Sequence, residues 1–482
     1  MLPGDHGQGR PPDPANASIE RLVNMFVQKT PEGAEYPYAL RRFYGLSLSD
    51  QNVGATIRRL HVMHREAGDA YLFAVASGSI YRSVGPDVTS FGAAAGSAIS
   101  ATDNVSMADN GVHCVISTGV TGNNLQYIAA AGGPTTIATV SAIRALCYMD
   151  GYLIGVKNNT NEFYISDPDD ATVWSATAFS TADAFPDVLV GCAAEGGLLH
   201  LFGLNHIEIW QNTGNALFPF ERVPGGIIKI GLVADGNNAV VAHGGRLFFP
   251  ANDHRVYTGV GTSFEPVSTP PIEHRFSSGI EGYISRSIDG RAFYVLDEQN
   301  DFTLAYDIDN GIWCELSSQG TDGGLEGRAC VSMFSGNSRE DYYAAINTDN
   351  LLVIDHGAPG SYNDNSDSEL VRECIIVTPP ISAGGRPIFF DEFMLEVETG
   401  VSSVTESGAN YPPEVSLEWT DNNGSTWSNP VYRPVGFSGE YNQRVSWCGL
   451  GRSPRQRSFR IKYSHNSPFN VIGAKARISV GP

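Results

Sequence analysis

The chain has 482 residues, too many for one compact hydrophobic core, so two or more domains are expected. It contains 53 Gly, 23 Phe and 20 Tyr but only 17% charged residues, a composition that favours β-structure. The formal net charge of −21 argues against a protein that wraps nucleic acid through many phosphate contacts. Such an acidic surface instead suits a soluble assembly, or a wall past which DNA slides without sticking.

The N-terminal region divides into two parts by composition. Residues 1–17 are rich in Gly, Pro and Asp and lack an apolar stretch, so they are expected to be disordered and are not a signal peptide. Residues 18–50 place Leu22, Met25 and Phe26 ahead of a Pro-Gly-Tyr stretch, which predicts an extended arm packed on another domain. No window of about 18 consecutive apolar residues occurs, so no membrane-spanning segment is expected.

One pattern recurs between residues 51 and 357: a short apolar strand, a polar turn and a second strand that ends in an aromatic or apolar pair. The copies start at Ala70, Gly111, Gly151, Gly197, Gly245, Gly290 and Asp341. A period of roughly 40–50 residues, with room for two more strands in each copy, predicts a β-propeller of six or seven blades. The turns NNTN, ANDH, EQND and NTDN supply Asn and Asp, which accept the positive φ of tight hairpins. The alternative is a β-sandwich or barrel whose hairpins recur at similar length.

The C-terminal part of the sequence has a different texture. Residues 358–368 (APGSYNDNSDS) have the composition of a linker. In residues 369–482 apolar and polar residues alternate, as in strands with one buried face. About seven such strands predict a β-sandwich platform domain. The expected fold is therefore all-β: a propeller over 51–357 and a sandwich over 369–482, with the N-terminal arm packed on the sandwich.

Side chains that commonly carry chemistry are scattered. The seven cysteines lie far apart with no CxxC pair, so they are expected to be small buried hydrophobic residues. This usage indicates a reducing place of synthesis and no disulfide framework. The eleven His form no HExxH motif or His–Cys cluster, and neither GxSxG nor a phosphate-binding glycine loop occurs. We therefore expect no metal, no cofactor and no nucleophilic catalysis.

Two groups of carboxylates could supply the acid pair of a glycoside hydrolase. The first group is Asp167, Asp169 and Asp170, and the second is Glu340 and Asp341. Both stand in turn-like sequence, where Asp is a preferred residue for conformational reasons. The chain is therefore not expected to be an enzyme.

The segment Thr420–Trp427 (TDNNGSTW) resembles the Asp-box hairpin of sialidase-type propellers, with Asn422 in place of the Asp. In that hairpin the Asp-like side chain ties the turn, Gly424 would supply the left-handed position, and Trp427 would pack beneath. A single imperfect copy outside the repeats predicts a structural hairpin rather than glycan chemistry.

Basic side chains gather near the C-terminus. Residues 433–482 hold seven Arg and two Lys against one acid, or 9 − 1 = +8, which leaves −21 − 8 = −29 for the rest of the chain. Arg452 and Arg455 are expected in a loop, with Arg457 and Arg460 on opposite faces of the strand that follows. Four like charges so close favour an acidic partner surface, so we predict that these four arginines dock a partner. The alternatives are a basic solvated face and local contact with nucleic acid.

Three stretches resemble the tail-nozzle, or packaged-DNA stabilisation (tail hub), proteins of short-tailed bacteriophages. They are the arm, LVNMFVQKTP…YALRRFYGL; the repeat segment LLHLFGLNHIEIWQNTGNALFPFERVPGGIIKIGLV; and the closing segment Val415–Ile478. The most specific part is the Arg-Val-x-Trp…Gly-Arg…Phe-Arg element of the closing segment. Together the three stretches cover nearly the whole chain in order.

This resemblance implies a structural protein of the virion, made in the host cytoplasm, that forms a hexameric ring at the distal end of the tail. The ring would bind an adaptor or portal ring above and a fibre or needle protein below or beside it. Double-stranded DNA would pass through its channel without specific binding. Deleting Met1–Leu46 is expected to weaken assembly but to leave the propeller folded.

Two other functions stay open at this point. A glycan-binding or glycan-cleaving propeller in receptor recognition would carry repeated Asp-boxes and clustered acids, and neither is present. A scaffold propeller of the cell would not resemble phage proteins at both ends.

Overall fold

The computed structural model describes residues 20–481 except 31, 34, 84–90, 94–98, 101–103, 119–121, 123, 274, 276–279, 287–289, 299–301, 319–326, 336–337, 346–348, 356–360, 363–369 and 403–410. These residues are almost entirely β-structure, as predicted, with one 3-10 turn, η1 (Gly236–Ala239), and one helical turn, α1 (Pro270–Glu273). The expected disordered segment, 1–17, and most of the expected linker, 358–368, lie outside the described residues.

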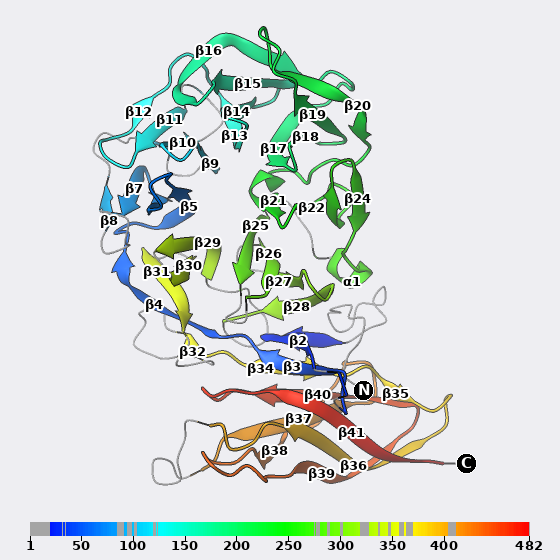
Figure 1. Cartoon of the computed structure of the whole chain (residues 1–482). Coiled ribbons are helices and arrows are strands. Elements are labelled where there is room, and N and C mark those ends of the chain that lie inside the picture. Colours follow the sequence, from blue (N-terminus) through cyan, green and yellow to red (C-terminus); the bar gives the residue numbers. More distant parts are fainter. Residues whose placement is uncertain are drawn as a thin grey trace.

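The predicted propeller is present, and in the described residues it has seven four-stranded blades arranged in a ring (Figure 1). Blade 1 consists of β5 (Ile57–His64), β6 (Ala70–Ala76), β7 (Ser79–Ser83) and β8 (Phe91–Ala93). Blade 2 consists of β9 (Val105–Asp109), β10 (His113–Thr118), β11 (Leu125–Ala129) and β12 (Thr135–Thr136). Blade 3 consists of β13 (Ile143–Met149), β14 (Tyr152–Lys157), β15 (Glu162–Asp167) and β16 (Asp170–Thr181). Blade 4 consists of β17 (Leu189–Glu195), β18 (Leu198–Gly203), β19 (Ile207–Asn212) and β20 (Phe220–Ile228). Blade 5 consists of β21 (Val241–His243), β22 (Arg246–Pro250), β23 (Val256–Val260) and β24 (Ser263–Pro266). Blade 6 consists of β25 (Glu281–Arg286), β26 (Ala292–Glu298), β27 (Phe302–Asp307) and β28 (Ile312–Leu316).

Blade 7 takes its strands from both ends of the propeller sequence. It consists of β29 (Gly327–Ser335), β30 (Ser338–Ala345), β31 (Asn350–Asp355) and β4 (Gly45–Asn52), with β32 (Ser361–Tyr362) and β33 (Leu370–Val371) added beyond β4. Strand β4 pairs antiparallel with β31, and Leu46 lies opposite Ile354. The propeller therefore begins at Gly45 rather than at the expected residue 51. Deleting Met1–Leu46 would remove the start of this outer strand, so the expectation that such a deletion spares the propeller does not fit the structure.

The ring closes through contacts between neighbouring innermost strands, from β5 through β9, β13, β17, β21 and β25 to β29 and back to β5. Each pair of neighbouring blades also shares a buried apolar cluster. Between blades 3 and 4, for example, Phe163 meets Trp210 edge-to-face at 5.1 Å between ring centroids. Apolar side chains on both faces of each blade explain why the repeats read as short apolar runs rather than as clean alternation.

The hairpin turns follow the predicted chemistry only in part. In NNTN, Asn159 adopts a φ of 56°, as expected of an Asn in a tight turn. In ANDH the positive φ falls on His254 instead, at 64°, while the Asp253 carboxylate accepts the Arg255 backbone N–H. The turns EQND and NTDN lie mostly outside the described residues.

The predicted β-sandwich follows the propeller and consists of two facing sheets. Its own strands are β34 (Cys374–Val377), β35 (Ile381–Ser382), β36 (Ile388–Val397), β37 (Glu414–Thr420), β38 (Val431–Pro434), β39 (Val445–Ser453), β40 (Gln456–Tyr463) and β41 (Val471–Val480). One sheet runs β34-β40-β37-β38, with β35 also paired to β40, and the other contains β41-β36-β39.

The N-terminal arm extends both sheets of the sandwich, one by a single strand and the other by a hairpin. Strand β1 (Arg21–Val23) pairs with β34, and the hairpin of β2 (Met25–Lys29) and β3 (Tyr38–Arg42) joins the other sheet through β41. In Figure 1 the blue arm strands lie between the propeller and the red and orange sandwich. The arm then continues into β4, so one segment serves the sandwich and the propeller in turn.

Candidate functional site: the joint between propeller and sandwich

The joint is built around β1, which pairs on both sides. Its residues lie antiparallel to β34, with Leu22 opposite Ile376, and Val23 also pairs in parallel with Glu315 of β28. The result is one continuous sheet, β25-β26-β27-β28-β1-β34-β40-β37-β38, that passes from blade 6 into the sandwich. A strand of only three residues therefore joins the two domains by backbone hydrogen bonds.

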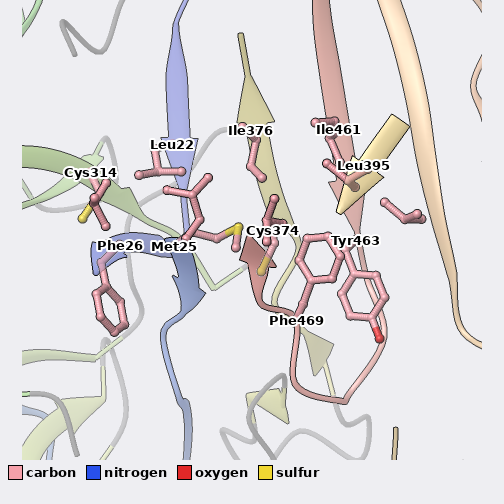
Figure 2. Packing of buried hydrophobic residues seen from close by; sticks show 14 of the residues in the cluster. Leu22, Met25, Phe26, Cys314, Cys374, Ile376, Leu395, Ile461, Tyr463 and Phe469 are labelled. Atoms are coloured by element: carbon pink, nitrogen blue, oxygen red, sulfur yellow. The ribbon is translucent and has the colours of Figure 1, made fainter. Parts of the chain in front are cut away.

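Apolar side chains of the arm fill the space around this sheet. Figure 2 shows Leu22, Met25 and Phe26 beside Cys314 of blade 6 and Cys374 of the sandwich. All five belong to one buried cluster, which also contains side chains of blade 7 and of both sandwich sheets. The two domains therefore share a hydrophobic core through the arm.

Asn24 forms the polar centre of the joint. It is fully buried with a φ of 57°, a left-handed conformation that Asn tolerates better than most residues. Its side-chain amide donates to the carbonyls of Ser317 and Glu373, both at 2.8 Å. Its side-chain oxygen accepts from the Ser317 N–H at 2.9 Å and from Arg372 Nη2 at 2.9 Å. One side chain thus satisfies groups of the propeller and of the sandwich together.

Glu315 carries the charge that holds the arm to blade 6. Arg21 Nε and Nη2 donate to its two carboxylate oxygens at 3.1 and 2.7 Å, and Arg275 Nη1 lies 3.4 Å from Oε1. Burial alone would raise the pKa of Glu315, but the two guanidinium charges outweigh it and hold that pKa below its ordinary value. The carboxylate therefore stays ionised inside the joint.

Two more arginines are buried on the sandwich side. Arg372 donates to the Tyr44 carbonyl at 2.6 Å, and Arg42 donates to the carbonyls of Ser467 at 2.8 Å and of Arg372. Burial, together with the neighbouring Arg42 charge, lowers the pKa of Arg372 to about 10. Both arginines use backbone carbonyls as acceptors, so they fix the path of the chain where arm and sandwich meet. A cavity of about 30 Å³, room for about one water molecule, borders Arg372.

The structure divides the four predicted docking arginines into two pairs. Arg457 is 2% exposed and makes a bidentate ion pair with Asp421 at 2.7 and 2.8 Å, below the ring of Phe390. It is therefore a structural residue, and its prediction as a docking residue is wrong because the sandwich core covers it. Arg460 points to the opposite face, as expected, where it pairs with Glu418 at 2.6 Å.

Arg452 and Arg455 are the exposed pair of this set. Arg455 lies in the turn between β39 and β40, whereas Arg452 lies on β39 opposite Phe389 rather than in a loop. Lys475 and Arg477 lie on β41 of the same sheet but form ion pairs, Lys475 with Glu35 and Glu396 and Arg477 with Glu392. The arginines of the predicted set that remain available for docking are Arg452 on β39 and Arg455 in the turn.

Of the carboxylates considered for glycan hydrolysis, Asp169 and Asp170 have the expected turn roles, whereas Asp341 is buried on β30, so its assignment to a turn is wrong. Asp169 occupies the left-handed position of the β15–β16 turn with a φ of 57°. Asp170 accepts the hydroxyl and backbone N–H of Thr172, and these hydrogen bonds lower its pKa. Asp341 accepts the Arg286 backbone N–H at 3.3 Å, while the Glu340 side chain lies outside the described residues.

The Asp-box-like segment forms the predicted hairpin between β37 and β38. Asn422 Oδ1 accepts the Thr426 backbone N–H at 2.9 Å, and the Thr420 hydroxyl accepts the Gly424 N–H at 3.0 Å. Gly424 has a φ of 84°, and Trp427 packs beside Val23 of the arm. The motif therefore stabilises a turn that borders the joint.

No sequence motif pointed to Glu315 or Arg372 as joint residues. The nearest signal was the VNM element of the arm, which contains Asn24. Partners of these residues lie about 300 positions away in the sequence, for example Asn24 with Ser317 and with Arg372. A single sequence carries no record of such pairs.

The part of the chain that the structure describes offers neither a metal-ligand cluster nor a membrane-spanning helix. There, no three His, Cys, Asp or Glu side chains converge as metal ligands. Within the same residues, no helix is long and apolar enough to cross a bilayer.

Comparison with known proteins gives two family matches in chain order. Residues 20–332 match the family model described as bacteriophage P22 Gp10, beta-propeller, and residues 373–479 match the model described as bacteriophage P22 Gp10, beta-sandwich. No curated protein matches the chain.

Several solved structures are similar to the propeller. They include BBS1N in complex with ARL6DN (8% identity, 65% of this chain, 98% of that chain, TM-score 0.45), the RRP9 WD40 repeats (12%, 65%, 99%, 0.41) and PorZ of Porphyromonas gingivalis (12%, 72%, 44%, 0.39). With TM-scores below 0.5, these likenesses carry no weight for function. The family matches are decisive, since one of them alone spans more than half of the sequence. The chain therefore belongs to the bacteriophage P22 Gp10 family of phage tail structural proteins, and the resemblance to tail-nozzle proteins is confirmed.

Proposed function

We propose that the chain is the nozzle subunit of a short tail, and that six copies form a distal ring that retains the packaged genome and passes it at ejection. The observation that carries this proposal is the division of charge: −29 over residues 1–432 and +8 over residues 433–482, from −21 = −29 + 8. Each copy has an acidic body and a basic end, so surfaces of opposite charge are available for assembly.

The acidic body suits a channel for duplex DNA. Six copies carry 6 × −21 = −126 formal charges. Acidic side chains offer phosphates no partners, and electrostatic repulsion keeps the duplex centred and mobile. DNA would therefore pass through the ring without specific binding.

The joint suits a part that bears mechanical load. A ring that retains pressurised DNA needs domains that keep a fixed orientation. The continuous sheet through β1, the buried Asn24 bonds and the Arg21–Glu315 ion pair support such rigidity. Buried polar networks of this kind favour one orientation because every alternative leaves charges and donors unpaired.

The exposed arginines are the docking residues of this proposal. Arg452 and Arg455 would meet an acidic surface of the neighbouring adaptor or portal ring, while a fibre or needle protein would bind elsewhere on the nozzle. The internal partners of Arg457 and Arg460 hold β40 in place and so position the adjacent turn.

The proposed role is non-enzymatic. Purified protein incubated with host surface polysaccharide should release no oligosaccharide. Phage that carry the Asp170→Asn variant should infect the host as efficiently as wild-type phage. Glycan cleavage that disappears in the variant would replace the structural role with a catalytic one.

Assembly can be tested in two steps. Negative-stain microscopy of the purified chain, alone and with the neighbouring tail ring, should reveal six-fold rings with a central hole. The variant Arg452→Glu/Arg455→Glu should fold normally but dock to the neighbouring ring at least about tenfold more weakly, and docking of the wild type should weaken as salt rises.

The matched control is Arg246→Glu/Arg255→Glu, which makes the same change in charge on the propeller at two exposed ion pairs. This control should dock normally. Equal loss in both variants would show that only net charge matters, and rings of another symmetry would refute the hexamer.

A further inference from the structure

Two cysteines from neighbouring blades lie together in the wall of the propeller. Cys147 is on β13, the innermost strand of blade 3, and Cys192 is on β17, the innermost strand of blade 4; the two strands are in contact. Cys192 is a buried member of the apolar cluster between these blades, and Cys147 packs against that cluster. Both side chains therefore face the same apolar cluster across the contact between β13 and β17.

Cys147 also borders a groove open to small molecules. The groove has a volume of about 680 Å³ and runs across the innermost strands of blades 1, 2 and 3. His64, Asp109 and Tyr148 line it together with Cys147. A small disulfide could therefore approach the half-buried Cys147 from the groove, whereas Cys192 lies behind it in the core.

We propose that Cys147 and Cys192 form a reversible disulfide between blades 3 and 4 when the protein meets a low-molecular-weight disulfide such as oxidised glutathione. In the first step the Cys147 thiolate attacks a glutathione sulfur, forms a mixed disulfide and expels one glutathione thiolate. In the second step the Cys192 thiolate attacks Cys147 Sγ and expels the other. One protein dithiol and one oxidised glutathione thus become one protein disulfide and two reduced glutathiones.

The order of these steps follows from the surroundings of the two thiols. The neighbouring Cys147 thiol, followed by burial, raises the pKa of Cys192 well above its ordinary value. The thiolate is the attacking species, so exchange begins at the more accessible Cys147. Cys192 can then attack the mixed disulfide because it packs in the same apolar cluster, on the neighbouring strand.

The bond would place a covalent link in a ring of blades that is otherwise closed by hairpins and side-chain packing. It would enclose strands β14, β15 and β16 in a covalent loop. Such a loop lowers the conformational entropy of the unfolded chain, so the oxidised propeller should be the more stable form. The reduced form would be present in a reducing cytoplasm and the linked form outside it.

The direct test is peptide mapping of the full-length protein after incubation with oxidised glutathione. Lys157 separates the two cysteines, so trypsin releases them on peptides 145–157 and 158–222. Without reductant, these peptides should appear as one linked species in most chains, and dithiothreitol should separate them. The melting temperature of the wild type should rise on oxidation and return on reduction.

Two variants distinguish this link from other thiol chemistry. Cys192→Ser should lose both the linked species and the redox-dependent shift in melting temperature. Cys448→Ser, which changes an exposed thiol, should retain both. Oxidised wild type that carries only glutathione on Cys147, or two free thiols, would overturn the proposal even if the variants fail to fold.

Discussion

The contact between blades 3 and 4 and the joint between propeller and sandwich are both buried, but they are built differently. The blade contact consists of apolar side chains such as Phe163, Leu199 and Leu201. The joint combines an apolar cluster with the buried polar groups of Asn24 and Glu315. Apolar packing tolerates many neighbours and so can be repeated around a ring, whereas a polar network accepts a single partner arrangement. The repeated contacts build the ring, and the joint fixes the sandwich at one place on it.

The largest effect is expected at Asn24. Asn24→Ala removes the hydrogen bonds that the Asn24 side chain makes with four groups in the joint and should destabilise the joint by about 5 kcal/mol. Hydrogen exchange of the β1 and β34 amides, measured against that of β14 and β18, should show the loss confined to the joint. Asn215→Ala, at an exposed turn residue, is the control and should change little. Equal loss of protection in all four strands would show that joint and blades unfold as one unit.

Glu315→Gln should come next. It leaves the largely buried side chains of Arg21 and Arg275 without their shared counter-charge, and breaking a buried pair typically costs about 3–5 kcal/mol. The free energy of opening from hydrogen exchange at β1 and β28 measures this cost. A change below about 1 kcal/mol would mean that the ion pair is solvated and weak.

The same carboxylate predicts how the joint responds to acid. Because the pKa of Glu315 is lowered in the folded protein, its stabilisation is present above the ordinary value of 4.5 and is lost as pH falls through the lower folded pKa. Protection of β1 should therefore fall in acid while that of β18 changes less. In Glu315→Gln this difference should disappear, and a pH profile unchanged by the substitution would assign the acid response to another group.

For the blade contact, Leu199→Ala should cost about 3 kcal/mol through the cavity it leaves. The loss of hydrogen-exchange protection should appear in the β14 and β18 amides. Unlike the protection of β1, it should not depend on acid. Leu198→Ala, a partly buried neighbour on the same strand, should cost less. An effect of Leu199→Ala on β1 comparable to that on β18 would show that the two regions are coupled.

The smallest effect is expected at the hairpin beside the joint. Asn422→Ala removes hydrogen bonds from a partly exposed turn and should cost about 1 kcal/mol. Calorimetric melting would measure this loss of stability, with Ser425→Ala in the same turn as the control variant. A loss above about 3 kcal/mol would give this turn a larger part in the joint than exposed bonds allow.

The sequence by itself determined the local order of the molecule. Apolar repeats with Asn-rich turns predicted the blades, alternation predicted the sandwich strands, and TDNNGSTW predicted a hairpin, because each depends on residues near one another in the chain. Alternation along β40 also placed Arg457 and Arg460 on opposite faces.

Only the tertiary structure decided the number of blades, the availability of the arginines and the nature of the joint. Blade 7 is completed by β4, whose residues lie far from β31 in sequence, so a repeat count could not separate six blades from seven. Arg457 is buried because Asp421 and Phe390 come to it from other strands. The joint depends on Asn24 meeting Ser317 and Arg372, pairs that exist only once the chain has closed its ring and folded its arm back onto the sandwich.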